Sequence, residues 1–198
     1  MPEFTPDLLL RLAVAFLMGS IPFAIVAMWG SGIDIRKVGS GNPGFNNVLR
    51  VSKPRSILCL AGDLGKGIAA VVLLYRPGEP LTAAWLLGFA VMLGHCYSPW
   101  LGFRGGKGIA TSAGVMLVLY PALALACVAG YVALRLVGKK RGWPESGAIA
   151  SLSCWAVFAV LVGVLQGPLL GGMAAIMFAI VTWRHKDNLR RIAAAGSG

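Results

Sequence analysis

Residues 38–50, VGSGNPGFNNVLR, concentrate three glycines, a serine, three asparagines and an arginine. Glycine allows a sharp turn with positive φ, and the backbone N–H groups of such a turn can form a concave nest that binds anions. Hydroxyl, amide and guanidinium groups add donors for a phosphate. The stretch predicts either a phosphate site or a glycine turn capped by asparagines, and its candidate residues are Gly39, Ser40, Gly41, Asn42, Gly44, Asn47 and Arg50.

The same glycines spell G-x-G-x-x-G, the pattern of a dinucleotide-binding turn, but their context does not fit. That pattern follows a strand, opens a helix and is followed by an acidic residue about 20 positions later. Here a long apolar run precedes it, Pro43 lies inside it, and Asp63 falls within the next apolar run. The sequence therefore excludes a Rossmann βαβ unit.

A second cluster lies in GHCYSPWLGFRGGKGIATS, residues 94–112. It is not a P-loop, because only three residues separate Gly102 from Gly106, where a P-loop requires four. Glycines and a cation at the start of a helix still favour an anion site. The candidates are Gly105, Gly106, Lys107 and Gly108, and the alternative is a positively charged loop at a membrane boundary.

A third cluster, TWRHKDNLRR, lies at the end of the last apolar run. If the helix continues through it, His185 and Asn188 share a face, with Arg184 and Arg191 close by. His185 could act as a base, orient a substrate or serve only as a structural hydrogen-bonding group. Arg184 is a candidate phosphate-binding residue, and His185, Asn188 and Ser40 of the first cluster are candidate catalytic residues.

One pair of opposite charges lies inside an apolar run. Asp63 and Lys66 are spaced i, i+3 and can form an ion pair, which is how such charges persist within a membrane. The pair has either a functional or a purely structural role. Glycines at 62, 65 and 67 would allow another helix to pack closely there.

The composition is that of an integral membrane protein. Hydrophobic residues make up 57% and charged residues 13% of the 198 positions, with a mean hydropathy of +0.76, whereas a soluble domain carries about 25% charged residues. We predict an all-α membrane protein of one domain, residues 1–198, with about seven transmembrane helices. The predicted spans cover residues 8–29, 55–75, 81–99, 107–120, 121–138, 147–165 and 168–184.

The positive charges set an orientation for these spans. When the 30–55 loop is placed in the cytoplasm, 15 of the 18 Lys and Arg residues fall on the cytoplasmic side. This predicts an external N-terminus and a cytoplasmic C-terminus, and it places all three clusters on the cytoplasmic side. The net charge of +11 follows from the loops and is no argument for nucleic-acid binding.

The sequence lacks the residue patterns expected for covalent or metal-assisted catalysis. The four cysteines are far apart, no G-x-S-x-G elbow occurs, and the seven Asp and Glu residues form no evident metal cluster. We therefore expect no metal and no cofactor. We also expect a monomer that works in contact with membrane lipid and binds no nucleic acid.

With these motifs in this order, the chain resembles the bacterial acyl-phosphate:glycerol-3-phosphate acyltransferase family over nearly its whole length. The matching residues are Gly39-Ser40-Gly41-Asn42, Gly44, Asn47 and Arg50; Asp63, Lys66 and Gly67; Gly94-His95, Phe103 and Gly105–Gly108; and Arg184-His185, Asn188 and Arg191. Two departures are Phe45-Asn46, where the family usually has Ala-Thr, and Ser98, where a proline is expected.

The resemblance implies a seven-span protein of the bacterial cytoplasmic (inner) membrane whose active site faces the cytoplasm. Such an enzyme transfers a fatty acyl group from acyl phosphate to the 1-hydroxyl of glycerol 3-phosphate. The products are lysophosphatidic acid and inorganic phosphate, in the first step of phospholipid synthesis, and acyl-CoA is not used directly. The alternatives are a transporter or binding protein for a phosphorylated solute, and a membrane scaffold with positive loops.

Overall fold

The computed structural model describes residues 2–196, which are helical or irregular throughout. The chain divides into two compact units, residues 1–119 and 120–198. The first unit contains α1 (Pro6–Ser20), α2 (Phe23–Met28), α3 (Phe45–Val51), α4 (Lys53–Leu74), α5 (Leu81–Cys96), a 3₁₀ turn η1 (Pro99–Leu101) and α6 (Ile109–Leu119). The second contains α7 (Pro121–Lys140), α8 (Ser146–Gln166), α9 (Pro168–Arg184) and α10 (Lys186–Ala195). The assignment of all residues to one domain stays a prediction.

The predicted apolar segments are largely helical, which confirms the all-α class, but the segment 8–29 is interrupted at residues 21–22 between α1 and α2. Five helical stretches within residues 2–196 are long and apolar enough to cross a membrane: Pro6–Met28, Lys53–Leu74, Leu81–Leu101, Pro121–Lys140 and Ser146–Gln166. Two further apolar helices, Ile109–Leu119 and Pro168–Arg184, are shorter. Seven crossings and the orientation of the termini stay predictions.

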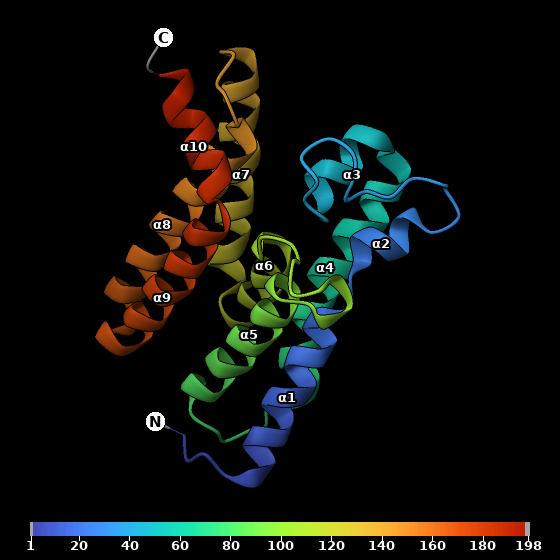
Figure 1. Ribbon diagram of the computed structural model, residues 1–198. Coiled ribbons are helices and arrows are strands. Elements are labelled where there is room, and N and C mark those ends of the chain that lie inside the picture. Colours follow the sequence, from blue (N-terminus) through green and yellow to red (C-terminus); the bar gives the residue numbers. More distant parts are fainter. Residues whose placement is uncertain (1, 197–198) are drawn as a thin grey trace. The chain divides into compact units, whose positions relative to one another are not determined.

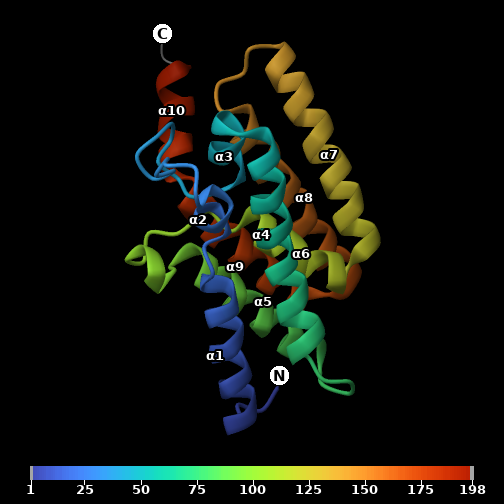
Figure 2. The ribbon, with the colours of Figure 1, turned by 90° about the vertical axis from the view of Figure 1, so that its right-hand side faces the viewer.

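The first unit is built on two close helix pairs. In Figures 1 and 2, α1 packs against α5, and α4 packs against α6. Glycines permit both contacts: a Cβ atom on Gly94 would lie 2.0 Å from the carbonyl oxygen of Phe16, and one on Gly67 would lie 2.1 Å from that of Thr111. Backbones this close require positions without side chains.

Arg11 of α1 organises one end of this unit. The guanidinium is 7% exposed, donates to the carbonyl oxygen of Leu74 at 2.7 Å, and pairs with the carboxylates of Asp7 and Glu79. These contacts connect α1 to the end of α4 and to the α4–α5 loop.

This network predicts a pH dependence of stability. The hydrogen bond from Arg11 lowers the pKa of Glu79, so the contribution of Glu79 is fully present above the ordinary carboxyl pKa and is lost as the pH falls through the lowered value. We expect Tm to fall less steeply between pH 6 and pH 3 in Glu79→Gln than in the unsubstituted protein. Thermal unfolding in detergent checks this, and equal slopes would contradict the assignment.

The second unit consists of α8 packed against α7 and α9, followed by α10. Gly163 and Gly171 allow α8 and α9 to approach closely, since a Cβ atom on Gly171 would lie 2.5 Å from the Cα of Gly163. The helix of the last apolar run does not continue through the third cluster. It ends at Arg184, and α10 begins at Lys186, with His185 between them at φ −96° and ψ 8°.

Candidate functional site

The first cluster lies on a loop with its own small core. Buried Ile35 and Val48 pack with residues of α2 and with Cys59 of α4, in a group comprising Ala24, Ala27, Met28, Ile35, Val48 and Cys59. The loop and α3 therefore sit against α2 and one end of α4 (Figure 2). On the exposed side, hydrogen bonds from Arg36 lower the pKa of Asp34 to about 2, so this carboxylate stays charged at neutral pH.

Asn47 ties the loop together from inside. Its amide group, 2% exposed, donates to the carbonyl oxygens of Ile35 at 2.9 Å and Val38 at 3.0 Å. Its Oδ1 accepts from the N–H of Ser40 at 3.0 Å. Both amide hydrogens are thus directed at loop backbone, and Asn47 supports the candidate site instead of presenting donors to a phosphate.

The remaining residues of the first cluster lie around this support. Ser40 and Arg50 are exposed, and Gly39 lies between Asn47 and Arg50: a Cβ atom there would be 2.3 Å from Asn47 Oδ1 and 3.8 Å from Arg50 Cδ. Gly39 and Gly41 have positive φ, as the turn prediction requires, whereas Gly44 has extended backbone with φ −163°. Asn42, half-buried, donates its N–H to Ser40 Oγ at 3.4 Å. The Ser40 hydroxyl therefore lies on a firmly held turn, and Arg50 of α3 lies beside Gly39 of that turn.

The glycines of the second cluster serve close packing. The N–H groups of Gly105 and Gly106 donate to the carbonyl oxygens of Cys96 and His95, each at 3.1 Å. These two amides therefore do not point outward as a nest, contrary to our sequence interpretation. Gly108 has φ +86° and packs on Met92 and Cys96, immediately before α6 begins. Lys107, which stands between Gly106 and Gly108 in the chain and is half-buried, is the cation that this loop positions.

In the third cluster, His185 and Asn188 are buried and Arg184 is half-buried. His185 Nδ1 lies 2.8 Å from the carbonyl oxygen of Val181. A carbonyl oxygen can only accept, so this contact suits the tautomer with the proton on Nδ1.

Glu145 is a residue of this cluster that sequence reasoning missed. Its carboxylate accepts from Asn188 Nδ2 at 2.6 Å and from Arg191 Nε at 2.5 Å. The residue has φ +52° at the start of α8, a conformation that non-glycine residues rarely adopt. Glu145 lies 43 positions from Asn188, so no local sequence pattern could have predicted this contact.

We expect Glu145→Gln to lower stability by about 1.5–3 kcal/mol, because charge-assisted hydrogen bonds are lost. The matched control is Asp187→Asn, which removes an exposed carboxylate paired with Arg190 at 3.2 Å; such surface pairs contribute about 0.2–1 kcal/mol. Thermal unfolding of the two variants checks this. Equal Tm values for both would show that Glu145 has no supporting role.

The structure organises the three clusters separately. The first is held against α2 and α4 and the second against α5, both in the first unit, while the third belongs to the second unit. The union of all three in one site stays a prediction. Among residues 2–196, no group of three or more His, Cys, Asp or Glu side chains is arranged to hold a metal ion.

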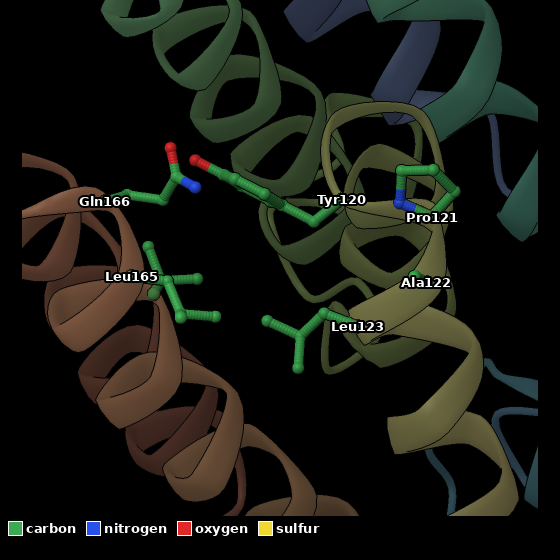
Figure 3. Close-up of a pocket in the computed structure, with 7 residues that line it drawn as sticks. Tyr120, Pro121, Ala122, Leu123, Leu165 and Gln166 are labelled. Atoms are coloured by element: carbon green, nitrogen blue, oxygen red, sulfur yellow. The ribbon is translucent and has the colours of Figure 1, made fainter.

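A pocket in the second unit lies apart from these residues. Figure 3 shows Tyr120, Leu123, Leu165 and Gln166 around it, with Pro121 and Ala122 at the start of α7. Its lining is almost wholly apolar, and none of the candidate residues contributes to it. It offers no group for phosphate chemistry.

Comparison with known proteins gives a consistent result. The glycerol-3-phosphate acyltransferase family model matches residues 9–195. A protein of that name from Cereibacter sphaeroides is 40% identical over 188 residues, covering 94% of this chain and 86% of the relative. One from Myxococcus xanthus is 39% identical, with coverages of 91% and 93%.

A solved structure is similar over the same extent. The crystal structure of PlsY (YgiH), an integral membrane glycerol 3-phosphate acyltransferase in its glycerol 3-phosphate form, aligns with a TM-score of 0.82 and 30% identity. The alignment covers 95% of this chain and 92% of that one. Together with the apolar helices, it supports a multi-pass membrane protein. The chain thus belongs to the glycerol-3-phosphate acyltransferase family.

Proposed function

We propose that this protein transfers a fatty acyl group from acyl phosphate to the 1-hydroxyl of glycerol 3-phosphate. The products are lysophosphatidic acid and inorganic phosphate, and the reaction begins phospholipid synthesis. The match of the family model over residues 9–195 carries the proposal. The exposed Ser40, on the turn held by Asn47, and the exposed Arg50 of α3 supply groups suited to a phosphorylated substrate.

The chemistry requires positioning more than activation, because phosphate is already a good leaving group. The hydroxyl oxygen attacks the acyl carbonyl carbon, the bond from that carbon to the phosphate oxygen breaks, and phosphate departs. Holding the two anionic substrates together can lower the barrier by roughly 7–11 kcal/mol. Arg50, Lys107 and Arg184 would neutralise phosphate charge.

The remaining roles concern orientation and the proton. Ser40 and Asn188 would orient the substrates through hydrogen bonds. The hydroxyl proton would pass to a phosphate oxygen or to the imidazole of His185. His185→Ala with near-normal turnover would remove both the base role and the orienting role of that residue.

The proposal also includes location and assembly. By the positive-inside rule the three clusters face the cytoplasm of a bacterial cell, in its cytoplasmic (inner) membrane. There the enzyme would act as a monomer, take its acyl substrate from the lipid phase, and need no cofactor.

The decisive experiment uses purified protein in liposomes, with palmitoyl phosphate as donor. We expect phosphate release and lysophosphatidic acid only when glycerol 3-phosphate is also present, and no product when palmitoyl-CoA replaces the donor. Product from palmitoyl-CoA alone would overturn the donor assignment. No product from either donor, with uptake of glycerol 3-phosphate into the liposomes, would identify a transporter.

Two cations should carry much of the phosphate binding. We expect Arg50→Ala and Lys107→Ala each to lower kcat/KM at least about tenfold, because a charge-assisted hydrogen bond contributes about 1.5–3 kcal/mol. Lys53→Ala, which removes an exposed cation at the start of α4, is the control and should retain the unsubstituted rate. Equal rates for all three variants would remove both cations from the site.

A further inference from the structure

A group of ionisable side chains that the reaction above does not use is buried inside the first unit. Asp63 and Lys66 on α4 and His95 on α5 are 2%, 5% and 8% exposed. Asp63 Oδ1 lies 2.9 Å from Lys66 Nζ and 3.3 Å from His95 Nδ1. A buried ion pair is rarely retained for stability alone, since a well-packed apolar pair is often as stable, so this cluster calls for another explanation.

The cluster is fixed on its far side by backbone and aromatic contacts. Lys66 Nζ donates to the carbonyl oxygen of Ile21 at 2.9 Å, in the break between α1 and α2, and lies 5.8 Å from the ring centre of Phe23. Asp63 Oδ2 is 3.7 Å from the Sγ of Cys59. The Asp63 carboxylate is therefore held in one place, and it presents Oδ1 to the imidazole.

On its near side, His95 contacts the glycine loop. A Cβ atom on Gly106 would lie 2.1 Å from His95 Nε2 and 2.7 Å from Cε1, so the imidazole edge lies directly on the Gly106 backbone. The carbonyl oxygen of His95 also accepts from the N–H of Gly106 at 3.1 Å. One residue thus contacts both the buried ion pair and the loop that carries Lys107.

We propose that His95 is a positioning residue for the loop Gly105–Gly108. The Asp63–Lys66 pair fixes the imidazole, and the imidazole fixes the loop and with it the cation Lys107. His95 Nδ1 faces Asp63 Oδ1 at 3.3 Å, and the opposite edge of the ring, with Nε2 and Cε1, faces Gly106. The proposal rests on the proposed function, because that function assigns Lys107 to a substrate phosphate.

The first test is kinetic. We expect His95→Ala to raise KM for glycerol 3-phosphate at least tenfold while kcat changes less than threefold. A small soluble anion depends on the cation for its affinity, whereas palmitoyl phosphate is also held by its acyl chain, so KM for the donor should change less. His95→Asn, which keeps a donor beside Asp63, should recover most of the loss.

The second test needs no substrate. Trypsin cleaves after Arg104 and Lys107 when the loop leaves α5, and we expect His95→Ala to speed cleavage at these bonds at least fivefold. The control is Thr82→Val, a buried substitution on the same helix of a residue whose hydroxyl has no hydrogen-bond partner within the described chain. It should keep both KM and the cleavage rate.

The outcomes separate the two hypotheses. Unchanged KM and cleavage in His95→Ala would overturn the positioning role. If that variant does not fold, Gly106→Ala decides through cleavage, because its methyl group displaces the imidazole from the loop: faster cleavage supports the role and unchanged cleavage overturns it. Absence of acyl transfer by the unsubstituted protein, with cleavage still faster in His95→Ala, would refute the proposed function and leave the positioning role standing.

Discussion

Asn47→Asp is expected to lower acyl-transfer activity at least about a hundredfold, although it changes only one amide to a carboxylate. The new oxygen would face the carbonyl oxygens of Ile35 and Val38, which now accept hydrogen bonds at 2.9 and 3.0 Å. A buried charge without a partner costs about 3–5 kcal/mol, more than the 2.7 kcal/mol that corresponds to a hundredfold. The turn that carries Ser40 and packs beside Arg50 of α3 would then lose its shape.

The loop supplies its own readout of that change. Trypsin sites at Arg36, Lys37 and Arg50 lie on or beside the turn, so cleavage there should accelerate in Asn47→Asp while the helices stay intact. Gln166→Glu makes the same chemical change at an exposed amide of the second unit and should leave both activity and cleavage unaltered. Native activity and slow cleavage in Asn47→Asp would show that the amide donors do not hold the loop.

The second large effect concerns stability. Gly67→Ala is expected to lower Tm by about 2–12 °C, since overpacking costs about 1–3 kcal/mol and each kcal/mol shifts Tm by about 2–4 °C in a domain of this size. The added Cβ atom would lie 2.1 Å from the carbonyl oxygen of Thr111 and 3.2 Å from the N of Val115. Both are backbone atoms of α6, so no side chain can rotate away and the helices must separate.

Gly65 provides a control on the same helix. A Cβ atom at this position would meet nothing within 4 Å, and alanine favours a helix over glycine by about 0.5–1 kcal/mol. Gly65→Ala should therefore match or slightly exceed the Tm of the unsubstituted protein. If the two alanine variants unfold at the same temperature, the α4–α6 contact is not close enough to exclude a methyl group.

The sequence alone located the apolar helical segments, because length and hydropathy are local properties, but it did not predict α3 or the break between α1 and α2. The apolar runs predicted for residues 121–138 and 168–184 correspond to α7, Pro121–Lys140, and α9, Pro168–Arg184. Pro121, as predicted, separates two helices. The positive φ angles of Gly39 and Gly41 likewise follow from residue type. Motif order was enough to identify the family, since it depends only on residue identity along the chain.

The hydrogen-bond partners of the polar groups could not be predicted from the local sequence. Asn47 has an amide group of the kind that can bind a phosphate. Its donors are nevertheless directed inward, because Ile35 and Val48 bury that side of the loop. The amides of Gly105 and Gly106 are taken by the end of α5. The helix break at His185 occurs without a proline or glycine, so residue type did not predict it.

Only tertiary structure brought together residues far apart in the chain. Glu145 reaches Asn188 and Arg191 across more than forty positions, and His95 joins Asp63 on another helix. Such contacts depend on how helices pack, which the residue types at either end do not specify. The sequence determined the membrane helices, the family and the candidate chemistry; the packing decided which of those polar groups hold the framework and which stay exposed.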